Sequence, residues 1–222
     1  MMAKHLYNGI SKIKSSEFWK IIFSIIGILI IILKPRSLFD IIRILLVSIL
    51  GIFSMILSLT IWVFKILGWG YLCKLKIKNF YCWTRLAILI FPILGLLAMI
   101  IVFITVFLNN PSYIYQLNFD SNKELRLILF FTAIFFSVGY IFESVAIYDL
   151  SIVYKNKTLK YGSIMYLLAV IISPIISMNS TRNLYLSILG NMFQVVISLF
   201  IYNGLSNVQK TIIYDQQYPR YR

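Results

Sequence analysis

The stretch LILFFTAIFFSVGYIFESVAIYDL, residues 127–150, decides the fold class of this chain. A transmembrane helix needs about 20 mostly apolar residues, and this stretch exceeds that length. It also carries Glu143 well inside the apolar run. A charged side chain near the middle of a membrane costs about 2.5–3.5 kcal/mol on insertion scales, so Glu143 needs a partner or a proton. We therefore expect a membrane helix with one functional or packing-critical acid.

Small residues share the helical face of Glu143. Counting by helical turns places Thr132, Gly139 and Ala146 on that face. Such a surface favours contact with another helix over contact with lipid. A second predicted seam of small residues lies in the segment 41–67, at Gly51, Ser54 and Ser58.

The composition indicates a membrane protein with no separate soluble domain. Of the 222 residues, 60% are hydrophobic and only 13% are charged, about half the charged fraction of a soluble domain. The net charge of +14 would suggest nucleic acid in a soluble protein. Here the basic residues sit in short loops beside apolar segments, where retention on the cytoplasmic side and anionic lipid account for them. We expect no nucleic-acid partner.

The apolar pattern predicts an all-α bundle of about six transmembrane helices in one domain, residues 18–203. The predicted spans are residues 18–33, 41–67, 86–108, 127–150, 162–178 and 184–202. A basic tail, residues 1–17, precedes them, and a polar tail, residues 204–222, follows. The first span is short, so an interfacial or re-entrant helix is the alternative for residues 18–33.

Loop charges predict the topology, because cytoplasmic loops are enriched in lysine and arginine. The net charge is +5 over residues 65–85, zero over 109–126, +3 over 151–161 and +1 over 179–183. With six spans, both termini are then cytoplasmic. The segment 34–43 disagrees, since it is basic and falls on the outer side.

The basic loops are expected to meet the anionic headgroups of the bilayer. Lys65 is expected to snorkel towards the same surface, and Asp149 to lie within reach of Lys155 or Lys157. The basic loop residues are Lys74, Lys76, Lys78, Arg85, Lys155, Lys157 and Lys160.

A polar stripe runs along the last predicted span. Ser187, Asn191, Gln194 and Ser198 are spaced by four, three and four residues, which puts them on one face of a helix. In a functional interpretation, Asn191 and Gln194 donate hydrogen bonds to Glu143 and line a polar path. In a structural interpretation, each polar group only fixes helix packing, at about 0.6 kcal/mol per interhelical hydrogen bond.

Enzymatic chemistry finds little support in the residues. Metal or nucleophilic catalysis needs clustered ligands or a nucleophile with a base, and the chain has one histidine, His5, in the N-terminal segment. Cys73 and Cys82 are too few for a metal site of about four ligands, so a structural role is expected for both. We predict no catalytic residues, no metal and no cofactor.

Three segments together resemble the Yip family of small multi-pass membrane proteins. They are KPRSLF at residues 34–39, FYCWTR at residues 80–85 leading into Phe91-Pro92, and IYNGLSNVQK at residues 201–210. Eukaryotic members of that family bind Rab-type GTPases. Here an additional span precedes the first motif, and the tyrosine- and glycine-rich motifs of the trafficking members are missing. The resemblance implies a helical, non-enzymatic membrane domain that works by association.

Two functions follow as expectations. The first is a non-enzymatic integral membrane protein that acts as an adaptor or subunit of a larger assembly, with protein partners or copies of itself. The alternative is a small transporter or permease component with a polar path around Glu143. Either would sit in a bacterial plasma membrane or an organellar membrane.

Overall fold

The protein is an all-helical bundle, as the sequence predicts. The computed structural model describes residues 2–33, 40–75, 78–109, 123–180 and 184–217, and this part of the chain contains no β-strand. Its six helices are α1 (Met2–Ile32), α2 (Ile41–Lys74), α3 (Asn79–Asn109), α4 (Lys123–Val153), α5 (Lys157–Ser180) and α6 (Leu184–Gln217).

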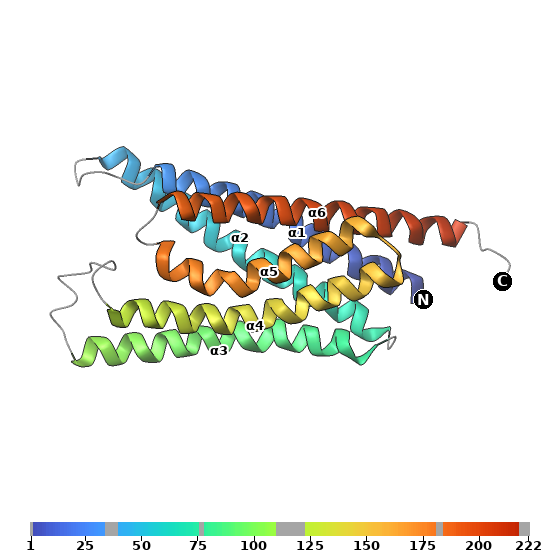
Figure 1. Cartoon of the computed structure of the whole chain (residues 1–222), viewed down its shortest axis with the longest axis horizontal. Helices are drawn as coiled ribbons and strands as arrows, with labels where there is room; N and C mark the ends of the chain where they lie inside the picture. The colour runs from blue at the N-terminus through green and yellow to red at the C-terminus, as the bar shows by residue number, and fades with distance from the viewer. Residues whose placement is uncertain (1, 34–39, 76–77, 110–122, 181–183, 218–222) are drawn as a thin grey trace.

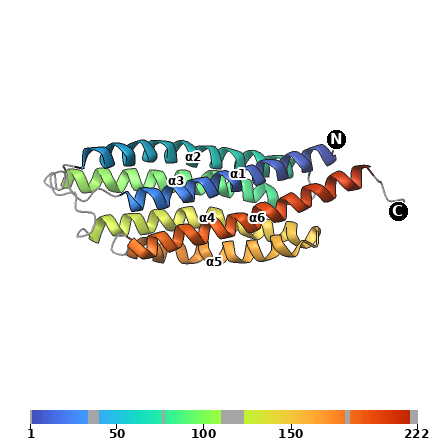
Figure 2. The same cartoon turned by 90° about the horizontal axis from the view of Figure 1, so that it is seen from above.

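The helices run up and down along one long axis and close into a ring. Each helix packs against its neighbours in the sequence, and α6 packs against α1. Both chain termini therefore lie at the same end of the bundle (Figures 1 and 2). We call this the termini end. The α2–α3 and α4–α5 connections also lie at this end. We call the opposite end of the bundle the far end.

Five of the helices are long and apolar enough to cross a membrane. They cover residues 4–32, 41–74, 79–101, 130–153 and 185–214 of the described chain. The predicted span 162–178 lies within α5, which does not meet the same criteria over its described residues. The helical bundle and its membrane character are thus supported, and five of the six described helices meet the length and hydropathy expected of a membrane span.

The prediction of a basic N-terminal tail is wrong for residues 2–17, which form the first half of α1. Ile10 and Ile13 are fully buried there. Gly9 and Gly68 let α1 and α2 approach closely, since an added Cβ at either would lie 3.0 Å from the carbonyl oxygen of the other. Lysines close to these buried positions in the linear sequence made the segment look polar, although its buried residues follow the 3.6-residue period of an amphipathic helix.

The prediction of a polar tail after residue 203 also needs correction, because α6 continues to Gln217. Leu205, Val208 and Ile212 are buried on this extension. Gly204 permits the closest approach of α5, since an added Cβ would meet Leu159 atoms at 2.7–2.8 Å. Residues 218–222 lie outside the described part of the chain.

The α2–α3 connection is much shorter than the gap between the predicted spans 41–67 and 86–108. Helix α2 continues to Lys74 and α3 begins at Asn79, so most of this gap is helical. Cys73 and Cys82 are joined by a disulfide that links the two helix ends. Lys76 lies outside the described residues.

Two helix-interior prolines have polar partners for the carbonyls that they leave free. A proline has no N–H, so the carbonyl four residues earlier loses its helical hydrogen bond. For Pro92 that carbonyl is on Ile88, and the indole of Trp62 donates to it from α2 at 2.8 Å. For Pro174 the carbonyl is on Val170, and Ser173 Oγ donates to it at 3.0 Å.

Candidate functional site

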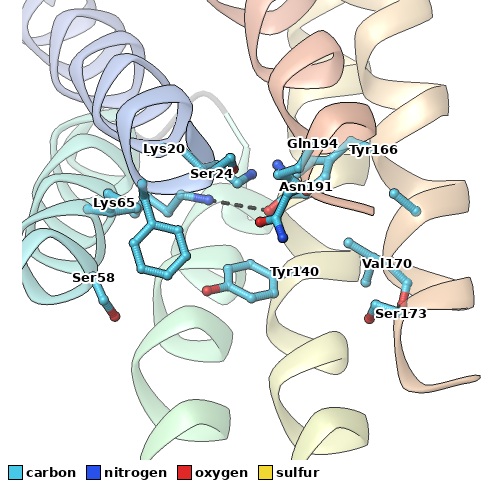
Figure 3. Close-up of a pocket in the computed structure, with 13 residues that line it drawn as sticks. Lys20, Ser24, Ser58, Lys65, Tyr140, Tyr166, Val170, Ser173, Asn191 and Gln194 are labelled. Carbon is cyan, nitrogen blue, oxygen red and sulfur yellow. Dashed lines mark hydrogen bonds between the residues drawn. The ribbon is translucent and has the colours of Figure 1, made fainter. Parts of the chain in front are cut away.

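Lys65 lies at the centre of a buried group of charges. Its side chain is 1% exposed, and its Nζ donates to Glu143 Oε2 at 2.5 Å. The hydroxyl of Tyr166 donates to the same carboxylate oxygen at 2.8 Å and accepts a longer bond from Lys65 at 3.3 Å. Figure 3 shows Lys65 reaching across from α2 to Tyr166 on α5. Three helices, α2, α4 and α5, therefore meet at one triad.

Helix α1 adds a second acid and a second base. Glu17 Oε1 lies 3.7 Å from Lys65 Nζ and 3.6 Å from Lys20 Nζ. Glu17 and Glu143 are both fully buried. Glu17, Lys20, Lys65 and Glu143 together form what we call the ion network, in which two positive charges face two negative ones.

Tyrosine rings flank the two lysines. Lys20 Nζ lies 3.9 Å from the centroid of the Tyr166 ring, and Lys65 Nζ lies 4.9 Å from that of Tyr140. Cation–π contacts of this kind stabilise an ammonium group that has lost its hydration. Tyr140 and Glu143 are one turn apart on α4, as Glu17 and Lys20 are on α1.

The energetics of the ion network are those of buried ion pairs. Desolvation of each charge costs several kcal/mol, and the partner charge offsets that cost. Removal of one partner leaves the other charged and buried. Hydrogen bonding is incomplete: within the described chain, both oxygens of Glu17, Glu143 Oε1 and Lys20 Nζ are buried without a hydrogen-bond partner.

A cavity of about 280 Å³ adjoins the ion network (Figure 3). It lies inside the helix ring and is lined by residues of α1, α2, α4, α5 and α6. The two lysines of the ion network line it, whereas Glu17 and Glu143 do not. The other polar lining residues are Ser24, Ser58, Tyr140, Tyr166, Ser173, Asn191 and Gln194.

The cavity is partly open, and its exposed lining residues lie on the far-end side of the ion network. Ser58 and Ser173 line it and are exposed. Each lies seven residues, or roughly 10 Å of helix, beyond Lys65 and Tyr166 in the direction of the far end. On the other side of the ion network, apolar side chains fill the ring: Ile10, Ile13, Trp69, Leu72, Ile147, Leu150, Leu159, Leu205 and Val208 are nearly or fully buried. The cavity thus lies between exposed serines on one side and a closed apolar core on the other.

The structure brings Glu143 and the polar stripe of α6 to the same region but does not join them. Asn191 and Gln194 line the cavity. Asn191 donates to the Ser187 carbonyl at 3.0 Å, and Gln194 to Ser198 Oγ at 3.3 Å. The predicted hydrogen bonds from these amides to Glu143 are wrong, since Lys65 and Tyr166 are its donors.

The two predicted seams have different surroundings. On α4, an added Cβ at Gly139 would lie 3.2 Å from the Ala87 carbonyl oxygen of α3, and Thr132 and Ala146 are buried on the same helix. On α2, Gly51 has open space around it. Ser54 is half-buried, and Ser58 lines the cavity.

The basic loop residues gather at the termini end. Lys74, Lys78 and Arg85 are exposed around the α2–α3 turn, and Lys155, Lys157 and Lys160 around the α4–α5 turn. Asp149 does not pair with Lys155 or Lys157 as expected. It forms an ion pair with Lys78 and accepts a hydrogen bond from Tyr81 at 2.8 Å.

Sequence reasoning missed most of the ion network. Lys65 was expected at the membrane surface, Glu17 falls in the predicted tail 1–17, and Lys20 lies at the edge of the predicted span 18–33. One signal was present: Lys65 is the only charged residue between Arg43 and Lys74. A lone lysine within such an apolar run has the same need for a partner as Glu143.

Comparison with known proteins finds no family model, no curated protein and no solved structure that matches the chain. The resemblance to the Yip family stays a prediction. Among the described residues, no three His, Cys, Asp or Glu side chains lie close enough to hold a metal ion.

The pairing of Lys65 with Glu143 can be tested by a double-mutant cycle. Glu143→Leu and Lys65→Met should each lower the free energy of unfolding by about 3–5 kcal/mol, because each leaves an uncompensated buried charge. The double variant, which keeps the Glu17–Lys20 pair, should lose clearly less than the sum. Unfolding by denaturant in detergent, followed by circular dichroism, measures all three.

Asp149→Asn is the control for this cycle, since the Asp149–Lys78 pair is partly exposed and should contribute under about 1 kcal/mol. If the loss of unfolding free energy in the double variant equalled the sum of the two single losses, Lys65 and Glu143 would not stabilise each other.

Proposed function

We propose that the protein is a small membrane transporter or permease component that binds its solute in the central cavity. The observation that carries the proposal is the position of the cavity: it lies inside the helix ring, is lined in part by polar side chains, and adjoins a balanced set of buried charges. Ionisable groups inside a membrane bundle are costly and mark solute or proton paths.

The asymmetric surroundings of the cavity support the same function. A solute carrier exposes its binding site to one side of the membrane at a time, and such sites lie near the midplane between helices. Here the exposed lining residues Ser58 and Ser173 lie on one side of Lys65, and the buried apolar core lies on the other. The prediction that the chain is not an enzyme agrees with this function and stays a prediction.

Proton flux in liposomes tests the proposed function. Wild-type protein should dissipate an imposed proton gradient faster than protein-free liposomes when small solutes are present, measured with an enclosed pH-sensitive dye. Glu143→Gln should lower the rate of gradient dissipation roughly tenfold or more, because it removes the carboxylate that balances the charge of Lys65. Tyr166→Phe, a milder change, should slow it less.

Asp149→Asn serves as the matched carboxylate control and should behave as wild type, since Asp149 lies outside the cavity lining. If wild-type protein were indistinguishable from empty liposomes with every solute tried, the transporter proposal would fail.

For orientation, we propose that the termini end faces the cytoplasm. Three segments support this, since basic residues of α1, the α2–α3 turn and the α4–α5 turn collect there. The disulfide at Cys73 and Cys82 points the other way, because disulfides persist mainly in oxidising compartments. We give the charge more weight, because it is spread over several loops and one cysteine pair is a single feature.

Thiol labelling decides the orientation. In sealed right-side-out vesicles treated with a permeant reductant, Cys73 and Cys82 should resist a membrane-impermeant maleimide until the membrane is opened. Asp40→Cys, at the far end and in a background with both native cysteines changed to serine, should be labelled at once. Labelling of the native pair in sealed vesicles would reverse the proposed orientation.

The second candidate function is the adaptor or subunit of a larger assembly. One observation favours it: the fully buried residues of α2 all lie from Leu57 onward, so most of the surface of its first half is exposed. Gly51 lies on this exposed half with open space around it. A small residue there would allow a partner helix to approach closely.

Gly51→Leu tests the subunit function without disturbing the fold, because nothing lies within 4 Å of an added Cβ. A partner that co-purifies stoichiometrically in gentle detergent, as quantified by mass spectrometry, should be lost from this variant. Gly190→Leu on α6, equally open, is the control and should retain it. If both variants retained the partner, the first half of α2 would be excluded as its binding surface.

A further inference from the structure

We infer that the cavity binds a small solute through an anionic group, with Lys20 as the anchoring cation. This inference rests on the proposed solute-binding function and adds the chemical class of the solute. It depends on which charges of the ion network reach the cavity and which of them are already satisfied.

The lining of the cavity is cationic, although the ion network is neutral as a whole. Lys20 and Lys65 line the cavity, whereas Glu17 and Glu143 do not. A solute in this space therefore lies beside the two lysine side chains of the network and beside neither of its carboxylates. That arrangement favours an anion over a cation.

The two lysines differ in how much of their hydrogen bonding is used. Lys65 is bonded to Glu143 and to Tyr166. Lys20 Nζ is buried and has no hydrogen-bond partner among the described residues, and its nearest charge, Glu17, lies beyond hydrogen-bond distance at 3.6 Å. A buried ammonium whose nearest partners are an aromatic ring at 3.9 Å and a carboxylate at 3.6 Å keeps hydrogen-bond donors for an anionic oxygen, and charge-assisted hydrogen bonds are the strongest in proteins.

The neighbours of Lys20 suit a small, polar anion. Ser24 lies one turn further along α1 and lines the same cavity, and in Figure 3 Lys20 points towards Asn191 and Gln194 of α6. Gly27 allows Asn191 to lie against α1, because an added Cβ would meet Asn191 Oδ1 at 2.9 Å. The cavity volume of about 280 Å³ is at the lower end for ligand sites. Carboxylate and phosphate are the anionic groups that this donor set fits.

Thermal unfolding of the purified full chain in detergent tests the inference with paired probes. Lactate and its neutral amide, lactamide, have nearly the same shape and differ in charge, and inorganic phosphate is the third probe. In chloride-free buffer, lactate or phosphate should raise the melting temperature in a saturable way, since a ligand of the native state stabilises it. Lactamide should have no effect at the same concentrations.

Three variants identify the anchor. Lys20→Gln should raise the half-saturating anion concentration roughly tenfold or more, as expected for a lost charge-assisted hydrogen bond. Lys20→Arg should restore most of the affinity. Lys12→Gln removes a positive charge from the same helix outside the cavity lining and should leave binding unchanged. The unliganded melting temperature of each variant controls for folding.

Equal effects of lactate and lactamide, no effect of either anion, or full anion affinity in Lys20→Gln would each overturn the inference. These outcomes are independent of the flux assay. Gradient dissipation that depends on Glu143 without anion binding would leave the transporter function in place and exclude the anionic solute. Anion binding without gradient dissipation would leave the anion site in place and exclude the transporter function.

Discussion

The burial of Lys65 between two carboxylates is the constraint on which the rest of the structure depends. An ammonium group 1% exposed in an apolar bundle is tolerable only with a negative partner in contact. Glu143 supplies it from α4 and Glu17 from α1, and Tyr166 completes the shell from α5. These contacts tie four of the six helices together at one level. Close packing at Gly9, Gly68 and Gly204 then holds the helix pairs on the termini side of that level.

The sequence predicted the helices well because their signal is local. Apolar runs, interior prolines and basic turns are read within a window of some 20 residues. Five of the six predicted spans lie inside observed helices, and the span 18–33 ends one residue beyond α1. The helix ends were less predictable. The extensions at residues 2–17 and 204–217 are amphipathic, and their buried stripe, which includes Ile10 and Leu205, is interrupted by charged and polar residues in the linear sequence. Periodicity identifies such a stripe only when it is tested along the whole segment.

The candidate site was only partly predictable, for a different physical reason. Glu143 stood out because a charge in an apolar run needs a partner, but its partner Lys65 is 78 positions away. Nothing local connects the two, and no periodicity argument chooses between Lys65 and the amides of α6. The amides of Asn191 and Gln194 instead bond within their own helix. Asn191 and Gln194 do line the same cavity, whereas the partner of Glu143 depends on how the helix ring closes.

The charge balance of the site links the two functional proposals. Two acids and two bases leave the ion network neutral while the cavity is empty of ligand charge. An anion at Lys20 would add one uncompensated negative charge to a low-dielectric region, which is unfavourable by several kcal/mol unless another charge changes. A proton entering with the anion restores neutrality, and the carboxylates of Glu17 and Glu143 are the groups in the network that can accept one. Charge balance therefore favours a proton as the companion of the anion in the proposed transport, and the buried acids that stabilise the fold are the groups that would take it up.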